Sequence, residues 1–382
     1  MSLKVRDAFK PFRDQEDGLI LTVGDETIPM LLTYQEVRSA AKDWQTYSSD
    51  APFRVPIPSE EDARSVRQLP IETDPPEHQK YRSLIEPFFR RPMQPDYIAR
   101  IDALIADTLR QCAGRASFDV VRDFALPIQS RALTFLLGVP ETEAETWISW
   151  GTHVFRDGGD PRQKGAVLET YLLSAIRDGA GGEDDANFFV ALNRMRVDDR
   201  PLNEAEMLGI SNLVFAGGRD TVINAIAFVM WCFARAPETL LAAAKAPRAI
   251  NLAVEEFIRV LSPLTHIGRV CPAKGGAEDR VSLCWAAANY DPAIFDDPET
   301  LNLARVPNPH VGFGSGHHAC LGAPQARAIL RSLIRNLAEH VRSLRIERED
   351  VNSERYQSVE RPVGFEQLLA ALELQGADPP AP

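Results

Sequence analysis

The sequence predicts a mainly helical protein with a small β region near its N-terminus. From about residue 74 to residue 262, apolar residues recur at helical spacing, and the helical runs end at glycine and proline clusters such as GVPETE and RDGGDPRQKG. The first 60 residues instead alternate short apolar runs with turn residues, for example in LILTVGDETIPMLLT, which is typical of strands. A long proline-rich, polar connection, SSDAPFRVPIPSEEDARSVRQLPIETDPPEH, separates these regions, and a connection of that length is usually functional or disordered.

The overall composition is that of an ordinary globular protein. Of 382 residues, 45% are hydrophobic and 25% are charged, which is enough to bury a large core. By length alone the chain would fit two domains, although single domains of this size exist. The 54 acidic residues outnumber the 42 basic ones, giving a formal charge of -12, which argues against a nucleic-acid-binding surface. Small molecules or proteins are therefore the expected partners.

The cysteines and the apolar segments indicate a soluble, cytoplasmic protein. The five cysteines, at positions 112, 232, 271, 284 and 320, form no CxxC pair, and an odd number in a long chain fits a reducing compartment. The N-terminus has no apolar signal-peptide core, and the sequence has no uncharged apolar run of ~18 residues. The longest apolar stretch, VINAIAFVMWCFA, is better explained as a buried helix, so we expect no membrane span.

A long helix is predicted from residue 203 to residue 237. Asn203 and Glu206 form a pair that resembles a capping box, and ~32 helical residues would span about 50 Å. The middle of this segment, GGRDT at 217–221, is unusual, because each glycine costs roughly 1 kcal/mol inside a helix and charge follows. Two interpretations stay open, namely a kink or close packing, and a helix opened beside a cofactor.

A second helical segment, NLAVEEFIRVLSP, carries Glu256 and Arg259 on one face. A pair at this spacing is commonly a weak ion pair on a solvated surface. The apolar neighbours Phe257, Ile258 and Leu261 would instead allow a buried pair. The sequence alone does not decide between the two.

The stretch HVGFGSGHHACLG, at 310–322, allows three kinds of site. A zinc site with Cys320 and His318 lacks a second cluster of ligands elsewhere in the chain. A cysteine nucleophile would need a base that folds over from elsewhere. The third possibility is a thiolate ligand of haem iron, which must be shielded and must receive backbone N–H bonds.

The glycines of this stretch suit the haem ligand best. Gly314 and Gly316 allow tight turns, and Gly322 allows close approach to a flat macrocycle. Amides that follow Cys320 could point at its sulfur, and Phe313 would cover the proximal side.

Four motifs together resemble the cytochrome P450 family. FGSGHHACLG matches the cysteine-ligand signature of the family, Phe-Gly-x-Gly-x-His-x-Cys-x-Gly, at every specified position. GGRDT is similar to the oxygen-activating motif of the long central helix, EEFIR to the Glu-x-x-Arg motif, and DPPEHQKYR to the start of the helix that carries a haem-propionate arginine. The motifs follow the order of the family and spread from residue 74 to residue 322.

The resemblance implies a single haem domain over residues 1–382, a triangular prism with haem b between the long helix and the cysteine loop. It makes Cys320 the iron ligand, and it makes Glu256, Arg259 and Arg305 a structural triad. His78, Arg82, Arg269 and His318 would bind the haem propionates, because buried carboxylates need paired cations. No role follows for His317.

The resemblance also implies the chemistry of a monooxygenase. Thr221 would hold oxygen or its water, Asp220 would bring protons from solvent, and Gly217 would widen the helix groove. Electrons would come from a separate ferredoxin and its reductase, with NAD(P)H involved only indirectly, because we expect no flavin or iron–sulfur segment after Leu372. Two exposed charges, Arg90 and Arg91, would contact an acidic partner or simply be solvated.

The substrate is the least determined part of the prediction. By resemblance the pocket would be lined mostly by apolar residues, which suggests a small hydrophobic substrate. The expected lining residues are Leu213, Val214, Gly217, Leu264, Thr265, Ile267, Val363 and neighbours up to Phe365, with parts of the 51–70 loop. Arg54, Arg64 and Arg67 could clamp a carboxylate, although we expect a solvated loop, and His266 is ambiguous.

Two other classes of protein compete with the monooxygenase. A haem protein that binds a ligand or gas without turnover would have no need for the acid and alcohol of Asp220 and Thr221. A cysteine hydrolase without haem would need a His-Asp arrangement, which the sequence does not suggest.

Overall fold

Two helices in line cross the centre of the molecule where the sequence predicts one. They are α9 (Glu204–Gly218) and α10 (Asp220–Arg235), and Arg219 between them has φ −105° and ψ −77°. Asn203 caps α9 because its side chain accepts a hydrogen bond from the amide of Glu206, whose carboxylate accepts one from the amide of Asn203. The segment from Glu204 to Arg235 is long and apolar enough to cross a membrane, but most of it is buried inside the fold.

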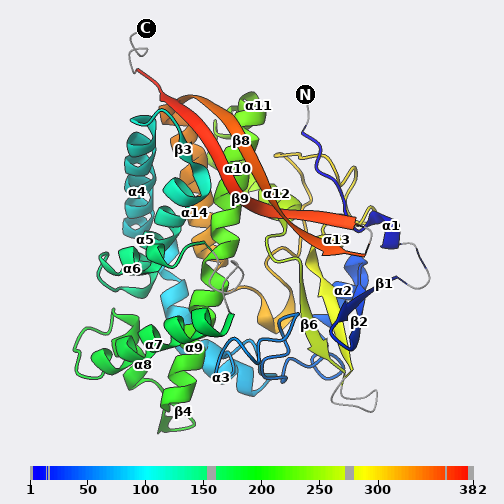
Figure 1. The fold of residues 1–382 in the computed structure, drawn as a ribbon, viewed down its shortest axis with the longest axis vertical. Helices are drawn as coiled ribbons and strands as arrows, with labels where there is room; N and C mark the ends of the chain where they lie inside the picture. The colour runs from blue at the N-terminus through cyan, green and yellow to red at the C-terminus, as the bar shows by residue number, and fades with distance from the viewer. Residues whose placement is uncertain are drawn as a thin grey trace.

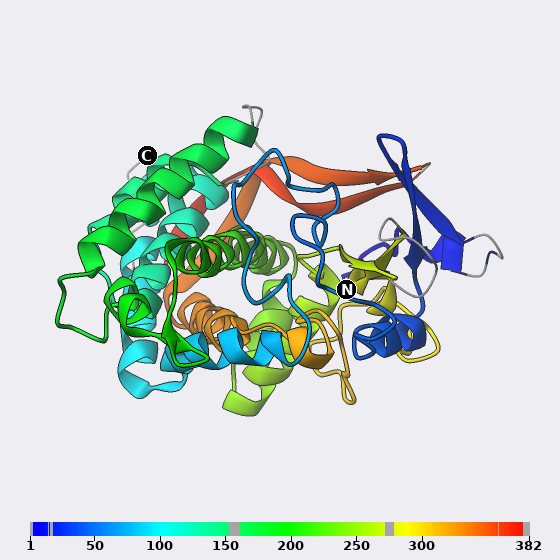
Figure 2. The same ribbon diagram turned by 90° about the horizontal axis from the view of Figure 1, so that it is seen from below.

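The computed structural model describes residues 3–13, 15, 18–152, 161–271, 279–357 and 359–376. Part of the predicted break at RDGGDPRQKG, residues 156–160, lies outside this range. Most of the helices pack around α9 and α10 (Figures 1 and 2). The larger ones are α3 (Glu77–Phe89), α4 (Pro95–Ala113), α5 (Leu126–Leu137), α6 (Glu143–Ser149), α7 (Pro161–Gly179), α8 (Phe188–Arg194), α11 (Pro237–Ala243), α12 (Pro247–Leu261) and α14 (Ala323–His340).

The other helical elements in the described part of the chain are short. They are α1 (Lys10–Arg13), α2 (Tyr34–Ala40), η1 (Arg91–Met93), η2 (Val120–Ala125), α13 (Trp285–Ala288) and η4 (Gly316–His318). The last of these lies inside the predicted cysteine loop.

The β region combines the predicted N-terminal strands with later ones. β1 (Leu19–Val23) and β2 (Glu26–Leu31) form an antiparallel hairpin, as the alternation predicts. β2 also pairs in parallel with β7 (Arg280–Cys284), which pairs antiparallel with β6 (His266–Val270). The strand order is β1-β2-β7-β6, so β7 lies between the N-terminal hairpin and the strand that carries Arg269.

A long C-terminal hairpin was not predicted. β8 (Val341–Tyr356) and β9 (Val359–Leu374) pair antiparallel and run from the helical part to the β part in Figure 1. β9 also pairs with β3 (Phe118–Asp119), and a small separate hairpin joins β4 (Arg196–Val197) to β5 (Arg200–Pro201). The sequence predicts strands only near the N-terminus, so the β structure of the protein is larger than expected.

The proline-rich connection is ordered although it contains no helix or strand between α2 and α3. Its centre is Glu72, which is wholly buried. The carboxylate of Glu72 binds the guanidinium of Arg64 and accepts hydrogen bonds from the amides of Phe53 (2.9 Å) and Gln68 (2.7 Å). Buried charge is tolerated here because each oxygen has several donors.

Candidate functional site

The cysteine loop is built as a tight turn that leads into α14. Gly314 (φ +72°) and Gly316 (φ +75°) adopt left-handed conformations, and a side chain at Gly316 would collide with the carbonyl oxygen of Ala41. The amide of Cys320 donates to the carbonyl of Phe313 at 2.8 Å. These contacts fix where the sulfur lies, immediately before the first turn of α14.

Cys320 is the one exposed cysteine of the five. Although part of its surface is open, the protein atoms packed around the sulfur remove most of its hydration, which raises the pKa of the thiol, while hydrogen bonds from the amides of Gly322 and Ala323 lower it. Its exposed surface faces a cleft of about 390 Å³, lined also by Phe313, Gly314 and Arg327. A Cβ atom at Gly322 would meet the sulfur only at an ordinary contact distance of 3.7 Å. The amides therefore make this sulfur a better thiolate than its burial alone would allow.

Three imidazole rings gather beside the loop. The ring centroids of His78 and His318 are 4.4 Å apart, those of His317 and His318 are 4.3 Å apart, and those of His78 and His317 are 5.3 Å apart. The Nε2 atom of each ring is buried and has no hydrogen-bond partner in the described part of the chain. Two guanidinium groups belong to the same region, because Arg82 and Arg269 both influence the charge of His317.

The electrostatics of this cluster favour an anion. Burial lowers the pKa of His78 to about 4, and burial together with Arg269 lowers the pKa of His318 well below its usual value. The rings are therefore neutral near pH 7, whereas the arginines keep their charge even though burial lowers the pKa of Arg269 to about 10. An unpaired buried donor is costly, so a ligand with several anionic oxygens would stabilise this arrangement.

These groups fit haem. A haem carries two carboxylates, and the unpaired imidazole nitrogens with the two arginines are the donors that carboxylates require. They belong to α3, β6 and the cysteine loop, which places them next to the thiol that would ligate the iron.

A second metal site is disfavoured. Asp74, His317 and His318 bring possible ligand atoms within 4.8 Å of one another, but two cationic arginines beside them oppose a bound cation. Among the described residues Cys320 belongs to no such cluster, so the zinc interpretation finds no support in the structure.

The GGRDT segment forms the break between α9 and α10. The hydroxyl of Thr221 donates to the carbonyl of Gly217 (3.2 Å), and the side chain of Gln129 donates to the carbonyl of Gly218 (2.7 Å). A Cβ atom at Gly217 would meet nothing within 4 Å. Side-chain hydrogen bonds thus satisfy the backbone carbonyls of Gly217 and Gly218 at the break. This geometry favours an opened helix over simple close packing. Asp220 lies at the first position of α10.

The predicted triad is assembled and buried. The carboxylate of Glu256 lies 2.8 Å from Nη2 of Arg259 and 3.0 Å from Nε of Arg305, and all three side chains are almost inaccessible. It also accepts a hydrogen bond from the amide of Asn302 at 3.0 Å. The weak surface pair considered from the sequence is therefore wrong, and the buried alternative is correct.

The expected substrate-pocket residues differ in exposure. Val214 and Val363 are buried, Leu213 and Ile267 are partly buried, and the side chain of Leu264 is 42% exposed. The hydroxyl of Thr265 is occupied, because it donates to Glu354 and accepts from Arg361 at 2.7 Å. Only the methyl group of Thr265 is left to line a pocket.

The arginines of the 51–70 loop are paired. Arg64 is buried between Glu60 and Glu72, so the expected solvated position is wrong for it, and it is not free to clamp a substrate carboxylate. Arg67 pairs with Asp50 at 2.6 Å, and Arg54 pairs with Glu26 at 3.2 Å.

His266 and the two arginines after α3 also have partners. The Nδ1 atom of His266 lies 3.0 Å from the hydroxyl of Ser282. Arg91 donates to the carbonyls of Leu136 (2.9 Å) and Ala186 (2.7 Å), so it is a structural residue rather than a free surface charge. Arg90 is exposed and pairs with Glu86.

Two features of the site are not evident from the sequence. The sequence suggests no role for His317, but its ring belongs to the imidazole cluster. Arg219 places a charge inside an apolar stretch of the sequence, and its side chain is wholly buried. No spacing rule could have found either, because both depend on contacts with distant segments.

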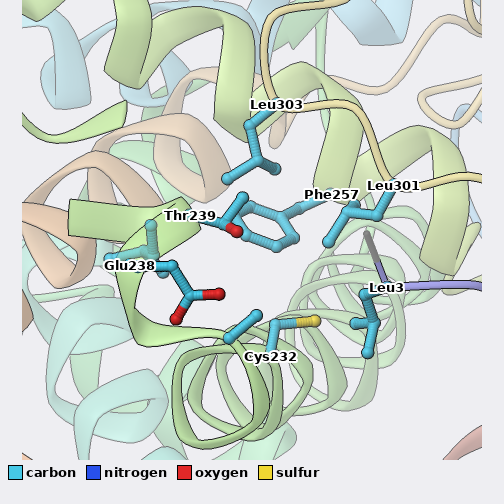
Figure 3. A pocket seen from close by; sticks show the side chains of 9 residues that line it. Leu3, Cys232, Glu238, Thr239, Phe257, Leu301 and Leu303 are labelled. Carbon is cyan, nitrogen blue, oxygen red and sulfur yellow. The ribbon is translucent and has the colours of Figure 1, made fainter. Parts of the chain in front are cut away.

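A separate cavity of about 300 Å³ lies where α10 meets α11 and α12. Figure 3 shows the apolar side chains of Leu301, Leu303 and Phe257 around it, with the carboxylate of Glu238 at one side. Burial holds the pKa of the Cys232 thiol well above its usual value, so it stays protonated. This cavity lacks the cations and thiolate of the cysteine loop and is not a candidate catalytic site.

Comparison with known proteins identifies the fold. A solved structure described as "The structure of a carbohydrate active P450" is 41% identical, with a TM-score of 0.93 over 97% of this chain and 99% of that one. A "Probable cytochrome P450 127A1" of Sinorhizobium fredii is 34% identical over 68% of this chain and 64% of its own length. The "Biotin biosynthesis cytochrome P450" of Bacillus subtilis is 28% identical over 78% of this chain and 80% of its own length. No family model matches the chain.

These similarities confirm the fold that the four motifs imply. They span between 68% and 97% of the chain and agree in naming cytochromes P450. The chain belongs to the cytochrome P450 family and is a haem monooxygenase.

Proposed function

We propose that this chain is a haem-thiolate monooxygenase in which Cys320 ligates the iron of haem b. The observation that carries the proposal is the convergence of a loop thiol, which accepts two amide hydrogen bonds, with two arginines and with three imidazoles whose Nε2 atoms are buried without a hydrogen-bond partner in the described part of the chain. His78, Arg82, Arg269 and His318 would hold the propionates. The haem would supply oxygen activation and oxygen insertion, and the protein would hold it, tune it and exclude water.

In this function Asp220 and Thr221 would deliver protons to the bound oxygen. A carboxyl group can carry protons from solvent, and a neighbouring hydroxyl can pass them into a dry pocket. The hydroxyl of Thr221 is held by the carbonyl of Gly217, so it stays at the break between the two helices. A haem protein that only binds a ligand would have no use for this pair, so the pair argues against a carrier or sensor.

A separate ferredoxin with its reductase is the proposed source of electrons. Helix α14 begins just after Cys320 and presents Arg327, Arg331 and Arg335 at intervals of four residues, which places them on one face. The side chains of Arg327 and Arg335 are each 36% exposed and pair with Glu255 (2.7 Å) and Asp102 (2.8 Å), whereas Arg331 between them donates to the amide oxygen of Asn251. An acidic partner would be attracted to this face.

A charge reversal tests this docking face. We expect R331E to slow reduction by a ferredoxin at low salt, with the difference shrinking as salt rises. R345E, on the exposed surface of β8, is the matched control and should have no effect. Equal rates for R331E and the unaltered protein would overturn the docking face without affecting the proposed chemistry.

A carbohydrate is the proposed substrate class. The support is that a solved structure with 41% identity over nearly the whole chain is described as carbohydrate active. Small hydrophobic compounds are the alternative, favoured by the apolar side chains of Leu213, Val214 and Val363.

The cytoplasm is the proposed location, because the cysteines form no CxxC pair and are odd in number.

Titration with candidate compounds tests the function. A substrate that displaces water from a haem pocket shifts the spin state of the iron, which changes the Soret absorption. We expect a saturable shift with a mono- or disaccharide and none with matched hydrophobic compounds. A shift only with hydrophobic compounds would overturn the carbohydrate proposal. No shift with either class, in protein with a full haem content, would favour the non-catalytic alternative.

A further inference from the structure

The turn between α12 and β6 is held in one shape by hydrogen bonds. Ser262, the first residue after α12, has a left-handed backbone conformation (φ +42°), which is uncommon for a residue other than glycine. Its hydroxyl donates to the carbonyl oxygen of Arg259 (2.8 Å) and accepts from the side-chain amide of Asn289 (2.8 Å). A conformation of this kind persists only where its surroundings over-determine it. The same turn carries Leu264, an exposed residue that is expected to line the pocket.

Arg361 of β9 reaches this turn from a distant part of the chain. Its side chain is buried, and its Nη2 atom donates to the carbonyl oxygens of Leu261 and Ser262 (2.9 Å). Its Nη1 atom donates to the hydroxyl of Thr265 (2.7 Å). Carbonyl groups at the C-terminal end of a helix have no partner within the helix and carry partial negative charge. Arg361 therefore caps α12 and ties β9 to the turn that follows it.

The neighbouring strand β8 holds the same hydroxyl. Glu354 lies directly opposite Arg361 in the register of the hairpin, and its carboxylate accepts the hydrogen bond that Thr265 donates. The carboxylate also accepts a hydrogen bond from the hydroxyl of Tyr356 (2.6 Å). Two cross-strand neighbours thus bind one hydroxyl, one as donor and one as acceptor. A shift of the turn away from the hairpin would break two hydrogen bonds to charged groups, which are the strong ones.

Just beyond this clamp, β9 carries an irregularity that touches α10. The register of the hairpin shifts between Asn352 and Ser353, which makes Val363 the extra residue of a β-bulge. Bulges of this kind re-aim side chains and are common next to active sites. The following Gly364 packs on α10, because a Cβ atom there would lie 2.2 Å from the side-chain oxygen of Asn224. The bulge therefore lies between α10 and the turn to which β9 is tied.

We propose that Arg361 is a positioning residue that sets the width of the substrate pocket. It holds the turn that carries Leu264 against the bulge that carries Val363, so two apolar walls from distant parts of the chain keep one spacing. Without the guanidinium, the turn and the bulge separate, and a ligand that packs on both walls loses contacts. A ligand too small to reach the walls is unaffected. The inference rests on the proposed function, which makes Leu264 and Val363 pocket residues.

Two variants and a matched control test this role. R361M removes the guanidinium, and T265V removes only the hydroxyl that both strands hold, while it keeps the methyl group. R91M is the control, because Arg91 also donates to two carbonyls, those of Leu136 and Ala186, but does so in the helical part of the protein. Hydrogen exchange of residues 261–268 should rise in R361M and stay unchanged in R91M.

The discriminating measurement is the binding of two haem ligands, imidazole and 4-phenylimidazole, followed by the shift of the Soret band in the oxidised protein. The phenyl group extends into the pocket, whereas imidazole alone occupies only the space next to the iron. We expect R361M to weaken binding of 4-phenylimidazole about fivefold or more and to change binding of imidazole by less than about twofold. T265V should act in the same direction with a smaller change, and R91M should match the unaltered protein.

Other outcomes overturn the positioning role. If R361M binds 4-phenylimidazole as tightly as the unaltered protein, or more tightly, Arg361 does not hold the two walls. If both compounds weaken by the same factor, Arg361 only stabilises the fold. Should R361M not fold, T265V against R91M decides, and an unchanged ratio of the two dissociation constants in T265V overturns the proposal.

The carbon monoxide spectrum of the same samples separates this failure from failure of the proposed function. If the unaltered protein lacks the band of a thiolate-ligated haem, the proposed function fails and the inference fails with it. If that band is present in every variant and the ratio of the two dissociation constants is unchanged, only the positioning role of Arg361 fails.

Discussion

The Nη1 atom of Arg82, on α3, lies 3.2 Å from the carbonyl oxygen of His317, in the cysteine loop. This hydrogen bond joins segments that are 235 residues apart in the sequence. It places the guanidinium beside the imidazole cluster of His78, His317 and His318. The anion-binding groups and the candidate iron ligand are thus held as one unit.

We predict that H318A loses haem faster than the unaltered protein. A hydrogen bond to a charged group contributes about 1.5–3 kcal/mol, so dissociation should accelerate by about tenfold or more. We expect H317A to act in the same direction, because its Nε2 atom is also buried without a partner in the described chain. Transfer of haem to an excess of an apo-globin, followed by absorption, measures the rate.

H310A is the control for haem retention. His310 belongs to the same loop, but its Nε2 atom lies 3.0 Å from Glu255 on α12, outside the imidazole cluster. It should leave haem transfer almost unchanged. Equal acceleration in H310A and H318A would show that the loop is merely loosened and would remove the support for a propionate clamp.

D220N and T221A are predicted to uncouple electron use from product formation. Loss of a positioned proton donor lowers the rate of the proton-dependent step about 100-fold or more. More of the reduced oxygen should therefore be released as hydrogen peroxide instead of entering the product. The ratio of peroxide to electrons consumed, with a surrogate ferredoxin and reductase, measures this. An unchanged ratio in both variants would contradict the proposed relay and favour the carrier interpretation.

E256A is predicted to lose about 3–5 kcal/mol of unfolding free energy. The substitution leaves the buried guanidinium groups of Arg259 and Arg305 without their carboxylate. E347A is the control, because its partner Arg345 is 74% exposed and such pairs contribute less than about 1 kcal/mol. Urea denaturation of both variants measures the difference, and similar losses would contradict a structural role for the triad.

The capping residue Glu206 should make stability depend on pH. The hydrogen bond from Arg200 holds the pKa of Glu206 at about 2, below its ordinary value of 4.5, although burial opposes this. The folded state therefore binds fewer protons than the unfolded state in this range, so the stabilisation is complete above about pH 5 and is lost as pH falls toward 2. E206Q should be less stable at pH 7, and its difference from the unaltered protein should shrink below about pH 4. A difference independent of pH would contradict this.

Some elements of the fold could be predicted from periodicity and local chemistry. The alternation over residues 19–31 predicts the β1–β2 hairpin, and the pair of Asn203 and Glu206 predicts the start of α9. The glycines of GGRDT indicate an irregular point in the long helix, because they are costly in a helix interior. These signals are local, so they can be detected without knowing the rest of the structure.

Other elements depend on contacts that the sequence does not reveal. The strand β8 is mostly exposed and carries charges throughout, so it shows no apolar alternation. Arg64 is buried only because the connection folds Glu72 back onto it. The position of His317 is set by α3, which comes from a distant part of the chain. The individual motifs, and by resemblance the groups at His78, Arg82, Arg269 and His318, could therefore be found from the sequence. The place of His317 in the cluster could not.

The central claim is that the thiolate of Cys320 ligates haem iron, and the carbon monoxide difference spectrum of the reduced protein tests it most directly. Thiolate ligation predicts a band at about 450 nm, which C320H should abolish while the protein keeps its fold by circular dichroism. A band at shorter wavelength in the freshly purified protein, or a band at about 450 nm that survives C320H, would contradict the claim.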